Sequence, residues 1–144
     1  MLEHNWIGLE GFEPDPKKHF GFIYLITNKN GQKYIGSKQF WSKRKESKKS
    51  DPKYGKFVVK ESKWKMYQSS NKIVQGWASE EIEKKVICIC GSKFELSYRE
   101  IEALIKTKAL LREDFENYMM GSNTIGRPPT YMILSKCRRL KPSY

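Results

Sequence analysis

The chain has 144 residues, of which 38% are hydrophobic and 13% aromatic, and its formal net charge is +12. This length and composition predict one domain with a modest core, and no apolar run approaches the ~20 residues that a membrane-spanning helix needs. A small domain with this excess of positive charge most often binds a polyanion, with nucleic acid as the first candidate. The three cysteines lack the spacing of a zinc site or a disulfide framework, so we expect buried reduced thiols in a cytoplasmic protein with no membrane partner.

The first 19 residues carry two prolines and two glycines, which predicts an irregular N-terminal lead-in. Two histidines lie here, His4 and His19, and both are expected to be surface or packing residues. The apolar side chains of the lead-in are expected to pack on the core: Trp6, Ile7, Leu9 and Phe12.

Two short apolar stretches, at 21–26 and 33–38, are joined by a segment that contains an Asn-Gly pair at 30–31. This pattern favours a β-hairpin, because glycine adopts a positive φ freely and asparagine tolerates it. The first stretch is almost continuously apolar, which predicts a central strand covered on both faces. Tyr24 and Tyr34 lie on opposite strands of this hairpin, ten residues apart in the sequence.

Positive charge is concentrated in residues 33–72, which contain 13 Lys and Arg residues and three acidic ones. Aromatic residues are interleaved with the lysines. Lysines supply sequence-independent phosphate contacts, and planar rings can stack on bases, so the segment suits a nucleic-acid interface.

Three elements are predicted within this basic region. Ser42 is expected to cap a short helix that runs to about Lys49. Residues 57–59 are β-branched or aromatic and predict a short additional strand. The two serines at 69–70 are expected to cap a helix over 71–77.

The later part of the domain predicts one strand and one long helix. Residues 85–90 are rich in β-branched side chains and end at Gly91, which indicates the third strand of an antiparallel sheet. Residues 95–111 carry an apolar stripe at helical spacing that should face this sheet. Ser97 and Glu100 fit a capping box at the start of this helix.

Four features of the chain belong together: a tripeptide in each arm of the predicted hairpin, an arginine ten residues after Tyr34, and a later segment that runs from a tryptophan to two serines. They are Phe22-Ile23-Tyr24, Tyr34-Ile35-Gly36, Arg44 and Trp64-Lys65-Met66-Tyr67-Gln68-Ser69-Ser70. Together they resemble the GIY-YIG nuclease superfamily, in particular its phage-type and homing-type endonucleases. The first half-motif is degenerate, with its glycine one position early at Gly21, and the second is intact. Lys48 and Gln68 stand where some members of the superfamily have histidines.

The resemblance covers roughly residues 20–120 and implies an α+β domain, in which helices flank a small three-stranded antiparallel sheet. We therefore expect an irregular lead-in over 1–19, a GIY-YIG nuclease domain over 20–120 and an irregular basic tail over 121–144. The tail carries five Lys and Arg residues and no acidic ones.

The resemblance also implies an endonuclease that hydrolyses phosphodiester bonds of double-stranded DNA with the help of a metal ion. By this analogy Tyr34 is favoured as the general base, and Tyr24 orients water or phosphate. We expect the basic surroundings to lower the pKa of the tyrosine that acts as base. Arg44 suits the charge on the phosphate, because its guanidinium stays ionised and forks onto two oxygens.

The metal-binding glutamate of the superfamily lies on the helix after the third strand, where Glu100 and Glu102 both remain candidates. Glu100 is favoured, because Tyr-x-Glu followed by an apolar helix resembles phage-type members. Its place in the expected capping box would give it a purely structural role instead. The carboxylate would hold Mg²⁺, or Mn²⁺, because hard cations prefer carboxylate and phosphate oxygens.

Further DNA contacts are expected from basic and polar residues around this site: Lys38, Lys43, Lys45, Lys48, Ser69, Ser70, Asn117 and Arg127. The missing histidines and the degenerate half-motif favour one alternative, a DNA-binding module that keeps the fold without cleavage. A protein whose basic face meets RNA or an acidic partner is a third hypothesis. The sequence leaves open which DNA sequence is the target, whether one strand or both are cut, and whether the protein is a monomer or a homodimer. A homing, a restriction and a DNA-degrading role in a bacterial or phage-infected cell all stay possible.

Overall fold

The computed structural model describes residues 4–45, 49–50, 52, 54–117 and 131, without the side chains at 44, 45 and 57. Six strands, two α-helices and three 3-10 helices lie in this part of the chain. The strands are β1 (Trp6–Ile7), β2 (Gly21–Asn28), β3 (Lys33–Gln39), β4 (Trp41–Lys45), β5 (Phe57–Glu61) and β6 (Ile82–Cys90). The helices are η1 (Trp64–Met66), α1 (Lys72–Gln75), η2 (Ser79–Glu81), α2 (Lys93–Thr107) and η3 (Ala109–Leu111).

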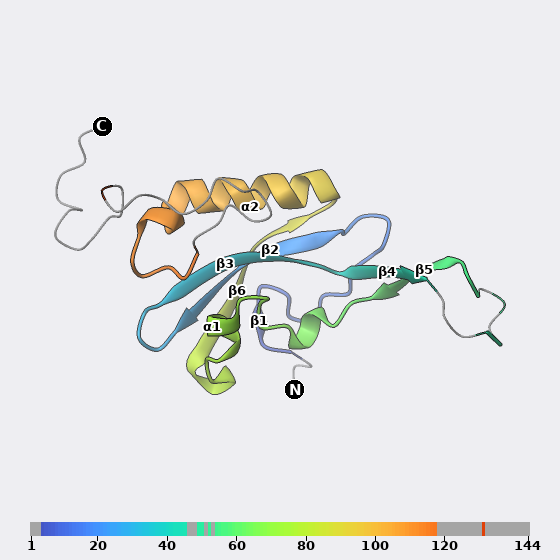
Figure 1. Cartoon of the computed structure of the whole chain (residues 1–144), viewed down its shortest axis with the longest axis horizontal. Helices are drawn as coiled ribbons and strands as arrows, with labels where there is room; N and C mark the ends of the chain where they lie inside the picture. The colour runs from blue at the N-terminus through green and yellow to red at the C-terminus, as the bar shows by residue number, and fades with distance from the viewer. Residues whose placement is uncertain (1–3, 46–48, 51, 53, 118–130, 132–144) are drawn as a thin grey trace.

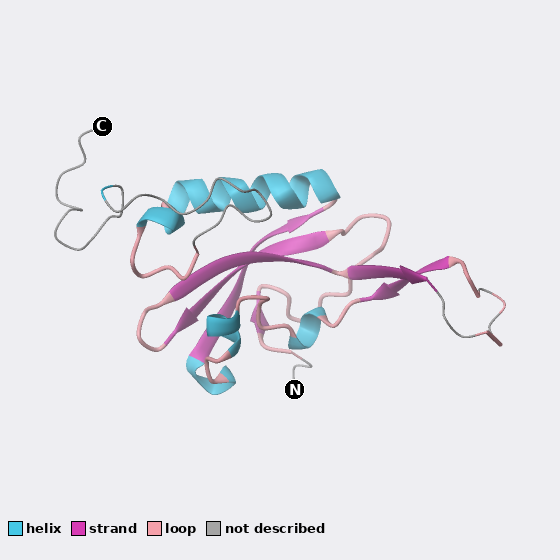
Figure 2. Ribbon diagram, in the orientation of Figure 1, coloured by secondary structure: helices cyan, strands magenta, loops and turns pink. Residues whose placement is uncertain are grey.

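A four-stranded sheet in the order β1-β6-β2-β3 forms the centre of the domain (Figure 1). Helix α2 lies along one face of this sheet, and the N-terminal segment, η1 and α1 lie on the opposite face. Strands β4 and β5 form a separate two-stranded sheet that projects from one end of the domain (Figure 2).

The predicted hairpin is confirmed as β2 and β3, which pair antiparallel. In its turn the side-chain oxygen of Asn28 accepts hydrogen bonds from the backbone N–H groups of Asn30 and Gln32, each at 2.9 Å. Gly31 adopts a φ of +83°, which an Asn-Gly turn provides for. The predicted third strand is also confirmed, because β6 pairs antiparallel with the other side of β2.

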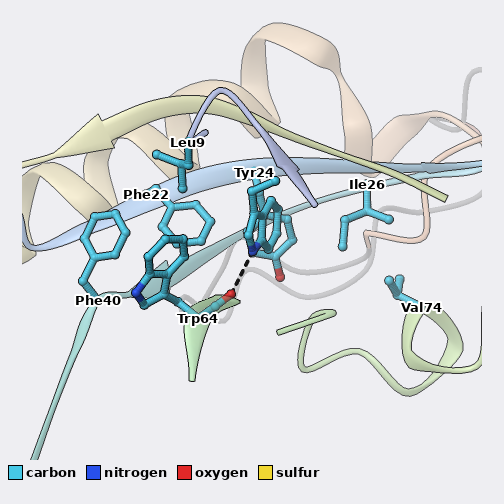
Figure 3. Close-up of a cluster of buried hydrophobic side chains, with 8 residues drawn as sticks. Leu9, Phe22, Tyr24, Ile26, Phe40, Trp64 and Val74 are labelled. Carbon is cyan, nitrogen blue, oxygen red and sulfur yellow. Dashed lines mark hydrogen bonds between the residues drawn. The ribbon is translucent and has the colours of Figure 1, made fainter. Parts of the chain in front are cut away.

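The N-terminal segment adds a fourth strand that was not predicted. Trp6 of β1 pairs in parallel with Lys84 of β6. The Trp6 indole is 1% exposed, and its Nε1 donates a hydrogen bond of 2.8 Å to the Trp64 carbonyl oxygen (Figure 3). The α+β class is therefore confirmed. The sheet is mixed instead of antiparallel, because β1 pairs in parallel with β6. The sequence did not predict β1, because a two-residue strand leaves no periodic pattern.

The prediction of a short helix that begins after Ser42 is wrong. Residues 41–45 form β4, which pairs antiparallel with β5 from Trp41 opposite Glu61 to Lys45 opposite Phe57. The strand predicted at 57–59 is present as β5 and gives β4 its partner. Pairing with β5 therefore overrides the weak local preference of the lysine-rich segment.

Two helix caps also differ from the prediction. Helix α2 begins two residues earlier than expected and is capped by Ser92, whose Oγ accepts a 3.1 Å hydrogen bond from the Glu95 N–H. The capping role assigned to Ser97 and Glu100 is therefore wrong, and Glu100 is available for another role. Helix α1 is capped by Asn71 rather than by the serines before it.

Alternate residues of β2 face opposite sides of the sheet, and each side buries a core, as predicted for a strand covered on both faces. One core lies against the N-terminal segment and η1 (Figure 3), and it comprises Trp6, Leu9, Phe22, Tyr24, Ile26, Phe40, Trp64 and Val74. The other lies under α2 and comprises Ile23, Ile35, Cys90, Leu96, Leu104, Ala109 and Phe115. Cys88 and Cys90 are free thiols, as expected, whereas Cys137 lies outside the described residues.

Lys84 is a charged residue on the side of the sheet that carries the first core. It is 4% exposed, and its Nζ lies 4.2 Å from the centre of the Trp6 ring. Burial lowers the pKa of the Lys84 ammonium to about 8. The unfolded chain keeps this proton up to the ordinary pKa of 10.5, so between these two values the unfolded state binds more protons and stability rises with pH.

We expect Lys84→Met to stabilise the domain at pH 7 by about 1–3 kcal/mol, because it removes a desolvated charge. In urea unfolding, wild type should gain stability between pH 7 and pH 10 relative to this variant. Lys85→Met is the matched control, because Lys85 is the exposed neighbour on the same strand. The same pH dependence in wild type and Lys84→Met would contradict this assignment.

Candidate active site

Three tyrosine side chains gather beside β3, an edge strand of the four-stranded sheet. Tyr24 is opposite Gly36, two residues along from Tyr34, so both tyrosines face the same side of the hairpin. Their ring centroids are 6.3 Å apart, and the Tyr67 ring lies 6.0 Å from that of Tyr24. The Nζ of Lys38 lies 4.4 Å from the centre of the Tyr67 ring. The cluster thus combines three phenols with one ammonium group.

Two glycines of the half-motifs allow this close approach. A Cβ at Gly36 would collide with the Tyr24 hydroxyl and lie 2.6 Å from the Tyr24 Cζ. A Cβ at Gly21 would lie 2.5 Å from the Lys38 carbonyl oxygen. Gly21 therefore lets the backbones of β2 and β3 approach closely, although it lies one position before the usual glycine of the first half-motif.

The loop between η1 and α1 brings Ser69 under the tyrosines. Ser69 is 2% exposed and has a φ of +84°, an uncommon conformation for a residue other than glycine. The loop is held by Gln75, whose side chain donates a 2.8 Å hydrogen bond to the Ser69 carbonyl oxygen. Gln68, at the position of a histidine in some relatives, donates to the carbonyl oxygens of Val74 and Trp77 at 2.9 and 2.8 Å. The Gln68 amide therefore ties the loop to α1.

Burial raises the pKa of both half-motif tyrosines. The pKa of the Tyr24 phenol is well above its ordinary value, mainly because the ring is buried. The pKa of Tyr34 is also raised, first by burial; the Ser69 hydroxyl opposes this shift and the Glu100 carboxylate adds to it. We expected basic neighbours to lower the pKa of the tyrosine that acts as base. That expectation is wrong for the described residues, because burial raises the pKa of both phenols and the Glu100 carboxylate adds to the rise at Tyr34.

Glu100 lies on α2 and faces β3. Its carboxylate accepts a 3.0 Å hydrogen bond from the Ser37 hydroxyl, and burial raises its pKa. Within the described residues no Lys or Arg forms an ion pair with Glu100. Glu102, by contrast, accepts from Arg99 at 3.0 Å and lies 3.8 Å from Lys106. The geometry therefore favours Glu100 over Glu102 as the carboxylate beside the tyrosines.

Glu100 fits a site for one hard divalent cation. A half-buried carboxylate with no cationic partner in the described part of the chain is a suitable oxygen ligand. No group of three or more His, Cys, Asp and Glu side chains that could hold a metal occurs among the described residues. Mg²⁺ tolerates such a site, because it commonly binds one or two carboxylates and keeps waters and phosphate oxygens as its other ligands.

Several predicted site residues do not join this cluster. The backbone of Arg44 lies in β4, on the projecting two-stranded sheet (Figure 1), and its side chain is not described. Lys43 is exposed on the same strand. The side chain of Lys45 and all of Lys48 and Arg127 lie outside the described residues.

The two serines and Asn117 have different surroundings. Ser70 is exposed, and its hydroxyl opposes the rise in the Tyr34 pKa. Asn117 is 9% exposed; its amide oxygen accepts from the Ile35 N–H at 2.9 Å and its amide nitrogen donates to the Ile35 carbonyl at 2.7 Å. The structure thus gives Asn117 a structural role, because its amide replaces a strand partner at the edge of β3. The DNA contact expected of Asn117 stays a prediction.

Sequence reasoning missed two members of the cluster, Tyr67 and Ser37. Tyr67 lies in the segment 64–70, which carries part of the family resemblance, but no role in the site was predicted for its side chain. Ser37 directly follows the second half-motif, and only the position of α2 brings it to Glu100. The first could have been proposed from its spacing to the serines, whereas the second required the packing of α2.

Comparison with protein families matches residues 6–122 to a family described as "Putative endonuclease segE, GIY-YIG domain". The chain belongs to this GIY-YIG family. The predicted resemblance is therefore confirmed, and the match also includes β1. Comparison with curated proteins and with solved structures gave no match. No helix in the described part of this GIY-YIG chain is long and apolar enough to cross a membrane.

We expect Gly36→Ala to lower the free energy of unfolding by about 1–3 kcal/mol, because the new methyl group overlaps the Tyr24 ring. Gly76→Ala is the matched control. A Cβ at Gly76 would have its nearest neighbour at 3.4 Å, and its φ is −79°. Urea unfolding of both variants tests this difference, and equal stability of the two would contradict the proposed contact.

Proposed function

We propose that this GIY-YIG chain is a metal-dependent endonuclease that hydrolyses phosphodiester bonds of double-stranded DNA. The observation that carries the proposal lies at the β3 edge, where the Glu100 carboxylate is close enough to Tyr34 to raise its pKa and Lys38 lies over the neighbouring Tyr67 ring. This set offers a hydroxyl for water, a carboxylate for a cation and an ammonium for phosphate. The net charge of +12 further favours an anionic polymer as substrate.

The two half-motif tyrosines differ in burial, which supports different roles for them. Tyr34 is half-buried, so water and a phosphate can reach its hydroxyl, and it orients the attacking water. Its pKa is raised in the structure, so it would act as the general base only with a cation bound at Glu100, whose charge would lower that pKa. Tyr24 is 1% exposed and supports Tyr34 from the core side. Tyr67 and Ser69 hold these two phenols in place.

The remaining charges act on the phosphate. A Mg²⁺ or Mn²⁺ ion held by Glu100 would supply positive charge for the transition state and for the leaving oxygen. Lys38 contacts a phosphate oxygen; burial lowers the pKa of its ammonium, and an adjacent phosphate would favour the charged form again. Arg44 contacts DNA from β4.

Tyr34→Phe and Glu100→Gln should each reduce cleavage of plasmid DNA in Mg²⁺ by at least about 100-fold, because each removes a group that acts on the reacting atoms. Glu102→Gln should stay within about threefold of wild type, because exposed ion pairs contribute little. The measurement is the rate of nicking and linearisation on gels. No cleavage by wild type in any divalent metal would sink the proposal. Such a result, together with salt-sensitive DNA binding, would favour a binding module of the same fold.

Cleavage at low pH should require more Mg²⁺ than cleavage at neutral pH. Glu100 must be ionised to hold a cation, and its raised pKa means that it is protonated at a higher pH than an ordinary glutamate. Ser37→Ala removes the hydrogen bond that lowers this pKa, so the half-maximal Mg²⁺ concentration should rise more steeply in the variant as the pH falls from 8 to 5.5. A constant ratio between variant and wild type across this range would contradict the assignment.

The proposal leaves two arrangements for cutting both strands. One site per chain cleaves one phosphodiester bond at a time, so a double-strand cut requires either a homodimer or two successive nicks by a monomer. Sequencing the ends produced on a long DNA gives the strand geometry and any base preference together. These ends also distinguish a homing or restriction role from general DNA degradation.

A further inference from the structure

The β4–β5 ribbon (residues 41–45 and 57–61) continues the strand that carries the candidate site. Only Phe40 separates the end of β3 from the start of β4. The ribbon extends beyond the four-stranded sheet at one end of the domain (Figures 1 and 2). Its position is therefore set by the same chain segment that positions Tyr34 and Lys38.

The base of the ribbon is firmly held. Phe40 and Trp64 are fully buried, with ring centroids 5.3 Å apart. After β5, the Ser62 N–H donates to the Phe40 carbonyl oxygen at 2.7 Å. The Trp41 Nε1 donates to the His19 carbonyl oxygen at 2.8 Å. These contacts fix the direction in which the ribbon leaves the domain.

Both faces of the ribbon carry exposed side chains. Lys43 and Val59 are directly opposite each other and share one face, and Ser42 and Lys60 share the other. Lys43 and Lys60 are exposed, and Val59 is 58% exposed. A two-stranded ribbon is only marginally stable on its own, so a bound partner would stabilise it. Exposed Val59 lies between the basic side chains of Lys43 and Lys60, which suits a partner that is both anionic and partly apolar.

We propose that this ribbon inserts into the major groove of the duplex that the site cleaves. This inference rests on the proposed function. The major groove is about 12 Å wide and admits a two-stranded β-ribbon, whereas the deep, narrow major groove of duplex RNA does not admit side chains. Lys43 and Lys60 contact phosphates on the rims of the groove, and Val59 contacts base edges, where the thymine methyl group is its apolar partner.

The length of the chain sets where these contacts fall. Lys43 on the ribbon is the sixth residue after Ser37, which lies beside Glu100. Extended chain rises about 3.3 Å per residue, so the two positions are at most about 20 Å apart, or about six base pairs along the duplex. The ribbon therefore reads the sequence within about six base pairs of the cut, and the domain selects its target without a separate recognition domain.

The first test measures DNA binding by Glu100→Gln protein, in which cleavage is blocked. Fluorescence anisotropy on a 30-base-pair duplex gives the dependence of affinity on salt. Adding Lys43→Ala and Lys60→Ala should reduce the salt slope by about 2, because two phosphate contacts are lost. Adding Lys93→Ala and Lys106→Ala is the matched control, because both lysines are exposed on α2, and it should change the slope by less than about 0.5. Equal slopes in the two variants would overturn the inference.

The second test uses Val59→Thr in the active protein, with the cleavage ends on a long DNA sequenced. The base preference within about six base pairs of the cut should differ from that of wild type. An unchanged preference would overturn base reading by the ribbon, as would duplex RNA of the same sequence binding as tightly as the DNA. If wild type binds DNA but does not cleave it, the proposed function fails alone, because the salt-slope test does not depend on cleavage.

Discussion

The contact between the Tyr24 ring and the backbone at Gly36 links the core of the domain to its candidate site. The ring is 1% exposed and lies 5.3 Å from the Trp6 ring, which itself is hydrogen-bonded to the segment before Tyr67. The same ring places its hydroxyl beside Tyr34 and Ser69. Because protein interiors are close-packed, a shift at this contact would move the core and the site together. The intact second half-motif therefore meets a packing requirement of the core, besides its proposed role in the site.

The cluster is built from groups that are held in unfavourable protonation environments. Burial raises the pKa of Tyr24, Tyr34 and Glu100 and lowers that of Lys38, so every shift favours the uncharged form. The positive φ of Ser69 adds backbone strain at the same place. Perturbed groups and backbone strain that coincide in this way are typical of functional sites.

The hairpin, the third strand and the long helix could be predicted, because an Asn-Gly turn and clear periodicity mark them. The cap of α2 was misplaced because two serine-to-glutamate patterns occur five residues apart, and only the structure selects Ser92 over Ser97. The choice between Glu100 and Glu102 likewise could not be made from the sequence. The two side chains differ by about 200° around the helix, so a small error in helical phase exchanges a residue that faces β3 with one that forms surface ion pairs.

The position of Arg44 depends on the one element that was predicted with the wrong type. Arg44 is the seventh residue after Ser37. In a helix these residues would advance about 10 Å and could return the guanidinium to the site, whereas in an extended chain they span about 23 Å. The pairing of β4 with β5 therefore directs the Arg44 backbone away from Tyr34. Within the described residues Lys38 is the cation beside the tyrosines. Under the proposed function, Lys43 and Lys60 of the ribbon would contact the rest of the duplex.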